Sequence, residues 1–89
     1  MNIIKKDGRI QELSMNKLRL SLQNASDDID APLTKSDISS LIEDINRQFK
    51  QLKIKIIPSR QVEDIVYNVL LDHGFNELAA FYGEYRKEE

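Results

Sequence analysis

The chain has 89 residues, a length that predicts a single domain spanning residues 1–89. Hydrophobic residues make up 40% of the chain and charged residues 31%, which is the composition of a soluble globular domain rather than of a disordered one. The chain has no cysteine, which excludes disulfides, thiolate chemistry and cysteine-based zinc sites. No apolar run is long enough to span a membrane and no signal-peptide pattern is present, so we expect a cytoplasmic protein without a membrane partner.

The net charge of −2 conceals a strong segregation of charge along the chain. Residues 1–20 carry a net charge of +3 and residues 50–60 carry +4, whereas residues 21–49 carry −4 and residues 61–85 carry −5. The positive charge falls on the predicted strands and helix entrances, and the predicted helices are acidic. A protein that inserts a helix into a DNA groove needs the opposite arrangement, so the sequence argues against a nucleic-acid partner.

The start of the chain predicts a β-hairpin followed by a helix. Strands are predicted over Asn2–Lys5 and Ile10–Leu13, and the Asp7-Gly8 pair between them favours a tight turn because glycine adopts positive φ at no steric cost. Ser14 offers an N-cap hydroxyl to the following helix. The hairpin is rich in lysine and arginine, which suits an anionic partner. Cations are also common on edge strands, where they prevent aggregation, and composition alone favours this second interpretation.

The first helix is predicted over residues 15–24. Its apolar face comprises Met15, Leu18, Leu22 and Ala25. Leucines alternate over residues 18–22, which leaves a strand open as an alternative. Residues 25–33 contain Ser-Asp-Asp and Ala-Pro and predict a loop. The aspartates in this segment lack the glycine and the terminal glutamate of a calcium loop, so a solvated loop is the better interpretation.

The second helix is predicted to begin at residues 34–37, where Thr-Lys-Ser-Asp has the spacing of a capping box. Its apolar side follows the helical period through Ile38, Leu41, Ile42, Ile45 and Phe49. Its solvated side includes Glu43, Asp44 and Arg47. Residues 52–56 then alternate strictly between apolar and lysine, which predicts a third, half-buried strand that ends at Pro58.

A third helix is predicted to start at Ser59, which can act as its cap, and to end before Gly74 in the C′ position. Its apolar stripe comprises Val62, Ile65, Val66, Val69 and Leu70. Asn76 is predicted to cap a fourth helix over residues 77–86. The buried side of that helix comprises Leu78, Phe81, Tyr82 and Tyr85. His73 lies at a helix end, where a cation interacts well with the helix dipole, and this structural role is favoured over a catalytic one.

These elements predict an α+β fold, a four-helix bundle capped by a small three-stranded β-sheet made from the N-terminal hairpin and one later strand. The sequence does not predict an enzyme. The single histidine lacks a cysteine or a marked serine partner for nucleophilic catalysis, and no cluster of metal ligands is apparent.

The motifs at both ends of the chain resemble the ATP-cone domain. At the start, the matching residues are the run from Ile3 to Arg9 followed by Asn16-Lys17-Leu18; towards the end they are Ser59, residues 62–66, Leu70, Gly74-Phe75, residues 77–79, Tyr82 and Tyr85-Arg86-Lys87. The resemblance covers roughly residues 2 to 87 and implies the same helical bundle with a small sheet. It also implies a regulatory site for ATP or dATP. Such cones usually form the N-terminal activity switch of ribonucleotide reductases, and one occurs in a zinc-ribbon transcriptional repressor of their genes.

The resemblance also implies the residues of the nucleotide site. They are Ile3, Lys5, Lys6, Gln11, Lys17, Leu18, Ser59, Glu63 and Lys87. Ile3 and Lys5 face the same way on a strand, so the first can cover a purine while the second reaches phosphate oxygens. Several lysines suit a triphosphate, which carries about four negative charges. Gln11 stands where relatives commonly have a glutamate near the base, a departure that bears on affinity or base preference. Lys6 replaces a usual arginine and loses its bidentate hydrogen bonding.

We therefore expect a non-enzymatic regulatory module that binds ATP or dATP, with or without an accompanying Mg²⁺ ion. It would act as an allosteric activity switch of a ribonucleotide reductase, and its partner would be a larger enzyme or another cone domain. The alternative is a protein-interaction module that kept the fold and lost nucleotide binding, for which Gln11 is the best support.

Overall fold

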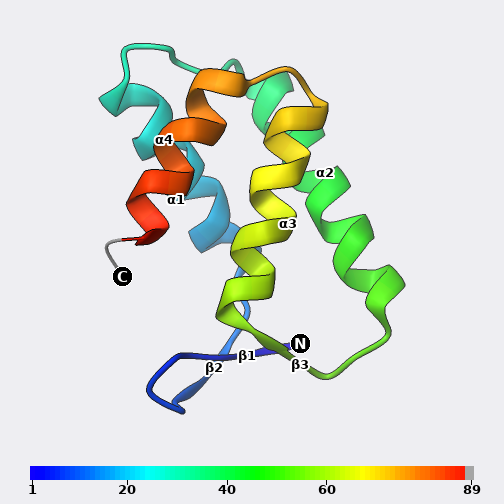
Figure 1. The fold of residues 1–89 in the computed structure, drawn as a ribbon. Coiled ribbons are helices and arrows are strands. Elements are labelled where there is room, and N and C mark those ends of the chain that lie inside the picture. Colours follow the sequence, from blue (N-terminus) through cyan, green and yellow to red (C-terminus); the bar gives the residue numbers. More distant parts are fainter. Residues whose placement is uncertain (88–89) are drawn as a thin grey trace.

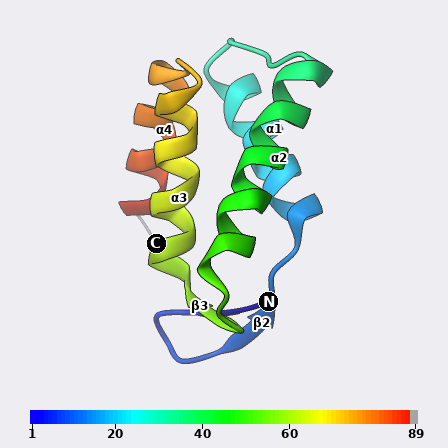
Figure 2. The ribbon, with the colours of Figure 1, turned by 90° about the vertical axis from the view of Figure 1, so that its right-hand side faces the viewer.

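Residues 1–87, the part of the chain whose backbone the computed structural model describes, form four helices and a small sheet, and side chains are described for residues 1–83. The helices stand side by side and the sheet closes one end of the bundle (Figures 1 and 2). The elements are β1 (Asn2–Ile4), β2 (Ile10–Glu12), α1 (Met15–Asp28), α2 (Lys35–Leu52), β3 (Ile56–Pro58), α3 (Ser59–Asp72) and α4 (Asn76–Lys87). The predicted α+β class and architecture are confirmed.

The hairpin of β1 and β2 forms where the sequence predicts it, with each strand one residue shorter. The two strands pair antiparallel, with Ile3 opposite Gln11. Gly8 has a φ of 89° and allows the tight turn. The turn is closed by the backbone N–H of Lys5, which donates to the carbonyl of Arg9 at 2.8 Å.

The third strand pairs parallel to β1 and gives the order β2-β1-β3. The predicted strand over residues 52–56 is wrong, because α2 continues through Leu52 and the strand begins at Ile56. Ile57, opposite Ile3, is the fully buried strand residue, whereas Ile56 is exposed. A shift of one residue reverses the face on which every strand side chain lies, so the alternation of isoleucines and lysines pointed to the wrong face.

The hydrophobic core lies between the four helices and reaches the inner face of the sheet. Side chains with no exposed surface include Leu22 of α1, Leu41 and Ile45 of α2, Ile57 of β3, and Val66, Val69 and Leu70 of α3. Leu78, Ala79 and Tyr82 bury the inner side of α4. Phe81 is only half-buried, and the side chain of Tyr85 lies outside the described residues. No helix among the described residues is both long and apolar enough to cross a membrane.

The first helix is longer than predicted. Residues 18–22 are helical, which settles the strand alternative, and α1 continues to Asp28, so the loop predicted from residue 25 begins four residues later. Ala25 and Ser26 are buried, and the Ser26 hydroxyl donates to the carbonyl of Gln23 at 2.9 Å. Their packing against the bundle extends the helix although the local sequence favours a turn, because tertiary burial outweighs weak local preference.

The second helix begins with the predicted capping box. The Thr34 hydroxyl accepts from the backbone N–H of Asp37 at 3.0 Å, and the Asp37 carboxylate accepts from the backbone N–H of Thr34 at 3.1 Å. The solvated role predicted for Asp44 is wrong, since its carboxylate is half-buried and lies 3.0 Å from Nε2 of His73, the C-cap of the neighbouring α3. His73 thus has a tertiary partner in addition to its place at a helix end.

The third helix ends in the predicted glycine cap. Gly74 has a φ of 84°, its N–H donates to the carbonyl of Leu71, and the N–H of Phe75 donates to the carbonyl of Leu70, which together make a Schellman motif. The helix starts differently from the prediction, because Pro58 occupies the N-cap and Ser59 is the first helical residue. Asn76 likewise lies inside α4 rather than capping it.

Gly83 lies within α4 where this helix crosses α3. A Cβ at this position would lie 3.4 Å from the ring of Tyr67. This distance is at the limit of ordinary van der Waals contact, so packing against Tyr67 favours a small residue but does not by itself require glycine, which costs about 1 kcal/mol relative to alanine in a helix.

One stability prediction follows from Lys53, which ends α2 in the left-handed conformation with a φ of 54°. We expect Lys53→Gly to raise the free energy of unfolding by up to about 1 kcal/mol. Relief of the left-handed strain, about 1–2 kcal/mol, exceeds the roughly 0.5–1 kcal/mol that glycine loses through its freedom in the unfolded chain. Urea unfolding measures the change. Lys50→Gly, in the regular last turn of α2, is the control and should cost about 1 kcal/mol; a loss in both variants would contradict the prediction.

A second prediction concerns acid. The hydrogen bond from His73, and secondarily one from Gln48 and the charge of Arg47, lower the pKa of Asp44 below its ordinary value of 3.8, against the opposing effect of desolvation. A lowered pKa stabilises the folded state above about pH 4, and this contribution disappears as the pH falls through the folded pKa. Asp44→Asn should therefore cost on the order of 1 kcal/mol at pH 6 and less at pH 3. Equal losses at both pH values, measured by urea unfolding, would show that the carboxylate charge is not responsible.

Candidate functional site

A cavity of about 200 Å³, here called the inner cavity, opens between the sheet and the ends of three helices. The hairpin contributes one side, α1 a second and α3 a third, and Tyr82 of α4 adds an aromatic wall. Its lining residues are Ile3, Lys5, Gln11, Glu12, Leu13, Ser14, Lys17, Leu18, Ser21, Ser59, Val62, Glu63 and Tyr82. Five of these residues are apolar or aromatic, four are charged, three are serines and one is an amide, a mixture that suits a polar ligand with an apolar part.

A second cavity of about 360 Å³, here called the outer cavity, lies beside the hairpin turn. It is lined by Lys5, Lys6, Asp7, Arg9 and Ser59. Lys5 and Ser59 line both cavities, so the two are adjacent. Together they reach the size usual for a small-molecule site, about 300–1,000 Å³.

The cations that line the two cavities are only partly paired with carboxylates. In the turn, the Asp7 carboxylate accepts from the backbone N–H of Arg9 at 3.1 Å and from its Nε at 2.7 Å. These bonds lower the pKa of Asp7 and pair the Arg9 charge, although both side chains stay exposed. Lys5, Lys6 and Lys17 form no ion pair with any side chain in the described part of the chain. The outer cavity thus keeps unneutralised positive charge.

The start of α3 adds to the positive character of the outer cavity. Its first turn contains no acidic residue, and its N-cap, Pro58, makes no side-chain hydrogen bond to the helix. The first N–H groups of a helix have no partner within the helix. These groups and the helix dipole together attract anions. Because Ser59 borders both cavities, these groups lie at the junction where an anion would be held.

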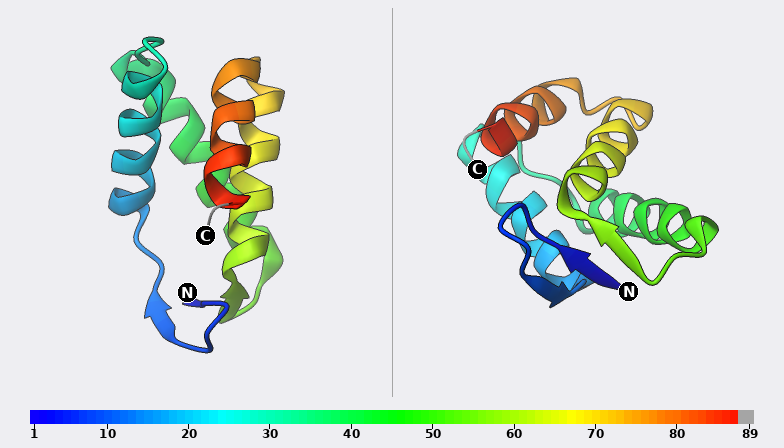
Figure 3. Two further views of the ribbon diagram at one scale, coloured as in Figure 1. Left: turned by 60° about the vertical axis from the view of Figure 1, so that its left-hand side comes forward. Right: turned by 60° about the horizontal axis from the view of Figure 1, so that its bottom comes forward.

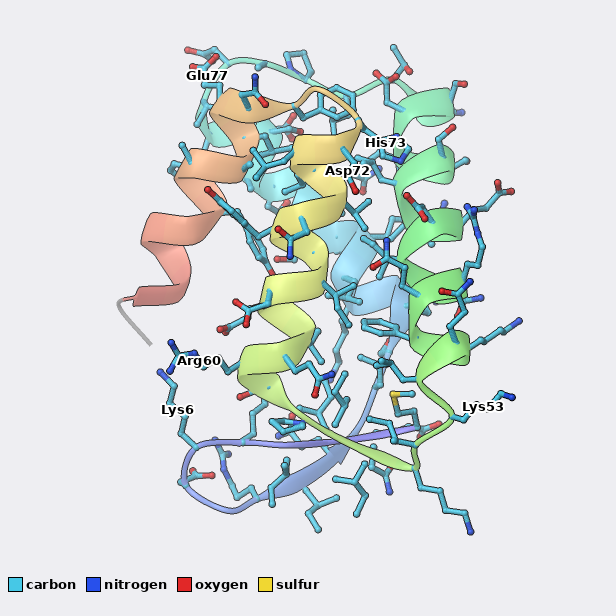
Figure 4. The ribbon with its side chains drawn as sticks, turned by 45° about the vertical axis from the view of Figure 1, so that its right-hand side comes forward. Lys6, Lys53, Arg60, Asp72, His73 and Glu77 are labelled. Carbon is cyan, nitrogen blue, oxygen red and sulfur yellow. The ribbon has the colours of Figure 1, made fainter. Side chains whose placement is uncertain are left out.

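Charge is also separated along the length of the molecule. Lys6, Lys53 and Arg60 lie near the sheet, whereas Asp72 and Glu77 lie at the opposite end of the bundle (Figure 4). The three aspartates near the end of α1 belong to that opposite end as well, since they precede the connection to α2 (Figures 1 and 2). Such a field draws polyanions to the sheet end.

The structure brings together the predicted site residues from distant parts of the sequence. The inner cavity is lined by Ile3, Lys5, Gln11, Lys17, Leu18, Ser59 and Glu63, and Lys6 lines the outer cavity. The remaining prediction, Lys87, is the last residue of α4, but its side chain lies outside the described residues. Helix α4 runs back towards the sheet end and stops on the side of the hairpin turn (Figures 1 and 3).

Several lining residues were not predicted. Ser21 follows Lys17 and Leu18 by four and three residues on α1, and Val62 follows Ser59 by three on α3, so helical spacing could have revealed both. Tyr82 was assigned to the core, and it is 8% exposed, yet it also borders the cavity. No sequence signal distinguishes a core tyrosine from one at a cavity wall. The other lining residues that were missed are Glu12, Leu13 and Ser14 of the inner cavity and Asp7 and Arg9 of the outer one.

No group of three or more histidine, cysteine, aspartate or glutamate side chains among the described residues is arranged to hold a metal ion.

Comparison with known proteins identifies the domain. The sequence matches the family described as "ATP cone domain" over residues 1–89. It is also similar to the transcriptional repressor NrdR of Anaplasma phagocytophilum (strain HZ), with 33% identity over 69 residues, 78% of this chain. The chain spans less than half of that relative, 44% of its length. The match to a transcriptional repressor means that the expected absence of a nucleic-acid partner has no support. The match over its whole length establishes that the chain belongs to the ATP-cone family.

Proposed function

We propose that the chain is a regulatory module that binds ATP or dATP in the two adjacent cavities. The main support is that lysines from the hairpin and α1, together with Ser59 of α3, surround one site and have no carboxylate partner among the described residues. Membership of the ATP-cone family agrees with nucleotide binding. In this proposal the base and ribose occupy the inner cavity and the phosphates the outer one.

Each part of the nucleotide would meet groups of suitable chemistry. Ile3, Leu18 and Val62 offer apolar contacts to the base, and the Gln11 amide has both a donor and an acceptor for an adenine edge. Glu63 borders the inner cavity and would accept a hydrogen bond from a ribose hydroxyl. Lys5 and Lys6 would neutralise the phosphates, with Mg²⁺ carried by the triphosphate itself. Lys87 is proposed as a further phosphate contact on the resemblance alone.

Binding would act as a switch because the ligand joins separate elements. A nucleotide that contacts the hairpin, α1 and α3 at once favours the arrangement in which these elements close on it, and a partner that prefers this arrangement would bind more tightly by the same coupling free energy. We propose that the switch controls a ribonucleotide reductase, through contact with a larger enzyme or another cone.

The similarity to NrdR supports a second target, control of transcription, in which nucleotide occupancy would alter a repressor rather than an enzyme. The other candidate is an interaction module without a ligand. Titration calorimetry with ATP and dATP separates the nucleotide proposals from this one: saturable heat with either nucleotide supports a nucleotide switch, and no heat with both supports the interaction module.

Lys5 provides the sharpest test of the phosphate assignment, since it borders both cavities and is half-buried. We expect Lys5→Ala to weaken ATP binding by about 1–3 kcal/mol, the usual value of a hydrogen bond to a charged group. The matched control is Lys35→Ala at the start of α2, at the far end of the bundle, which removes the same charge and should leave affinity unchanged. Equal affinities for all three proteins would show that Lys5 does not bind phosphate.

Glu63 allows a test of sugar recognition. If its carboxylate accepts from the ribose 2′-hydroxyl, Glu63→Ala should lower the ratio of ATP to dATP affinity by roughly fivefold, because dATP lacks that hydroxyl and a single hydrogen bond contributes about 1 kcal/mol. The ratio is informative because any general effect of removing a negative charge acts on both nucleotides equally. A ratio equal to that of the unmodified protein would rule out the 2′-hydroxyl contact.

A further inference from the structure

Arg60 is an exposed cation that neither the sequence analysis nor the cavity lining assigns to the site. It follows Ser59, the residue that borders both cavities, in the first turn of α3. No acidic residue lies in that turn, and Arg60 makes no ion pair with any side chain in the described part of the chain.

Helix stability does not explain an arginine at this position. The start of a helix is the positive end of its dipole, so a cation there is unfavourable by a few tenths of a kcal/mol to about 1 kcal/mol. Acidic or hydroxyl-bearing residues are the usual choice in the first turn and at the cap, and here the cap is Pro58. Arg60 therefore adds positive charge where the helix and the nearby lysines already supply it.

The side chain of Arg60 is directed towards the hairpin turn. In Figure 4, Arg60 and Lys6 extend to the same side of the molecule and their charged ends meet in this view, whereas Lys53 points away on the other side of the sheet end. The outer cavity, lined by Lys6 and Ser59, links the two elements independently of the view. Two cations on the same side of the site repel each other, and a polyanion bound between them would be attracted to both.

The cations also follow an order from the inside outwards. Of these two cavities, Lys17 borders only the inner one, Lys5 borders both, and Lys6 borders only the outer one. Arg60 follows Ser59 in the chain and extends to the same side as Lys6 in Figure 4, so it would extend this series beyond the outer cavity. A nucleotide whose base lies in the inner cavity would therefore direct its phosphates along the series, with the last phosphate nearest to Lys6 and Arg60.

We propose that Arg60 binds the terminal phosphate and makes the site selective for nucleoside triphosphates over monophosphates. The inference rests on the proposed nucleotide function and adds a residue that determines the number of phosphates. The planar guanidinium can donate two parallel hydrogen bonds to one phosphate. Lys6, with its single ammonium group, would provide a point charge beside it.

The test compares ATP, ADP and AMP by calorimetry on the unmodified protein, on Arg60→Ala and on the control Lys53→Ala. Both variants remove one exposed positive charge from the sheet end, so a general effect of net charge is matched. We expect Arg60→Ala to lose about tenfold or more in ATP affinity and to keep its AMP affinity within about twofold, since a charge-assisted bond is lost only with the longer ligand. Lys53→Ala should bind all three nucleotides as the unmodified protein does.

The results distinguish this inference from the function on which it rests. If the unmodified protein binds ATP and Arg60→Ala binds it equally well, the role of Arg60 is overturned and the nucleotide function stands. A loss that is the same for ATP and AMP also overturns it, because Arg60 would then not read the terminal phosphate. If the unmodified protein binds none of the nucleotides, the proposed function fails first. An unchanged thermal unfolding midpoint confirms that the variants are folded.

Discussion

The parallel pairing of β1 with β3 is the constraint on which the rest of the structure depends. It joins the first residues of the chain to the middle of the sequence, with Ile3 opposite Ile57. Because β3 leads directly into α3, this pairing brings Lys5 and the start of α3 to the same place. Without it, the hairpin would have no fixed position relative to the bundle and the cations of the site would not converge.

The sheet also gives the molecule two different faces. Ile57 and Ile3 pack towards the helical core, and Gln11 lies in the cavity beside them, whereas Ile4, Ile10 and Ile56 remain exposed. Alternation along each strand produces this division, since neighbouring residues point to opposite sides. Three strands of three residues bury little apolar area on their own, so the sheet owes its order to the helices that it closes. A ligand held between the sheet and the helices would strengthen this weak junction.

Much of the fold could be predicted from local signals. The Asp-Gly turn, the Thr34–Asp37 capping box and the Gly74 cap are determined by short-range chemistry, and all three are present. The third strand was misplaced because its register depends on β1, far away in sequence, and local alternation indicated the wrong face. The end of α1 was missed for the same kind of reason, since burial of Ala25 and Ser26 extends a helix that the local sequence would stop.

Most of the candidate site could be predicted because a family resemblance supplied the residues, and the fold places eight of the nine around two cavities. Ser21 follows from helical spacing, whereas Tyr82 and Arg60 could not be identified in this way, because their relation to the site depends on how the helices pack. Their contribution appears only once the hairpin, α1, α3 and α4 are in position.

The central claim is that a nucleotide binds between the sheet and the start of α3. The most direct measurement is an NMR titration of the ¹⁵N-labelled protein with ATP. The claim predicts that the largest backbone amide shifts occur at Lys5, Gln11 and Ser59, with little change at Asp72 and Gly74 at the opposite end of the bundle. Shifts concentrated at that opposite end, or none at saturating ATP, would contradict it.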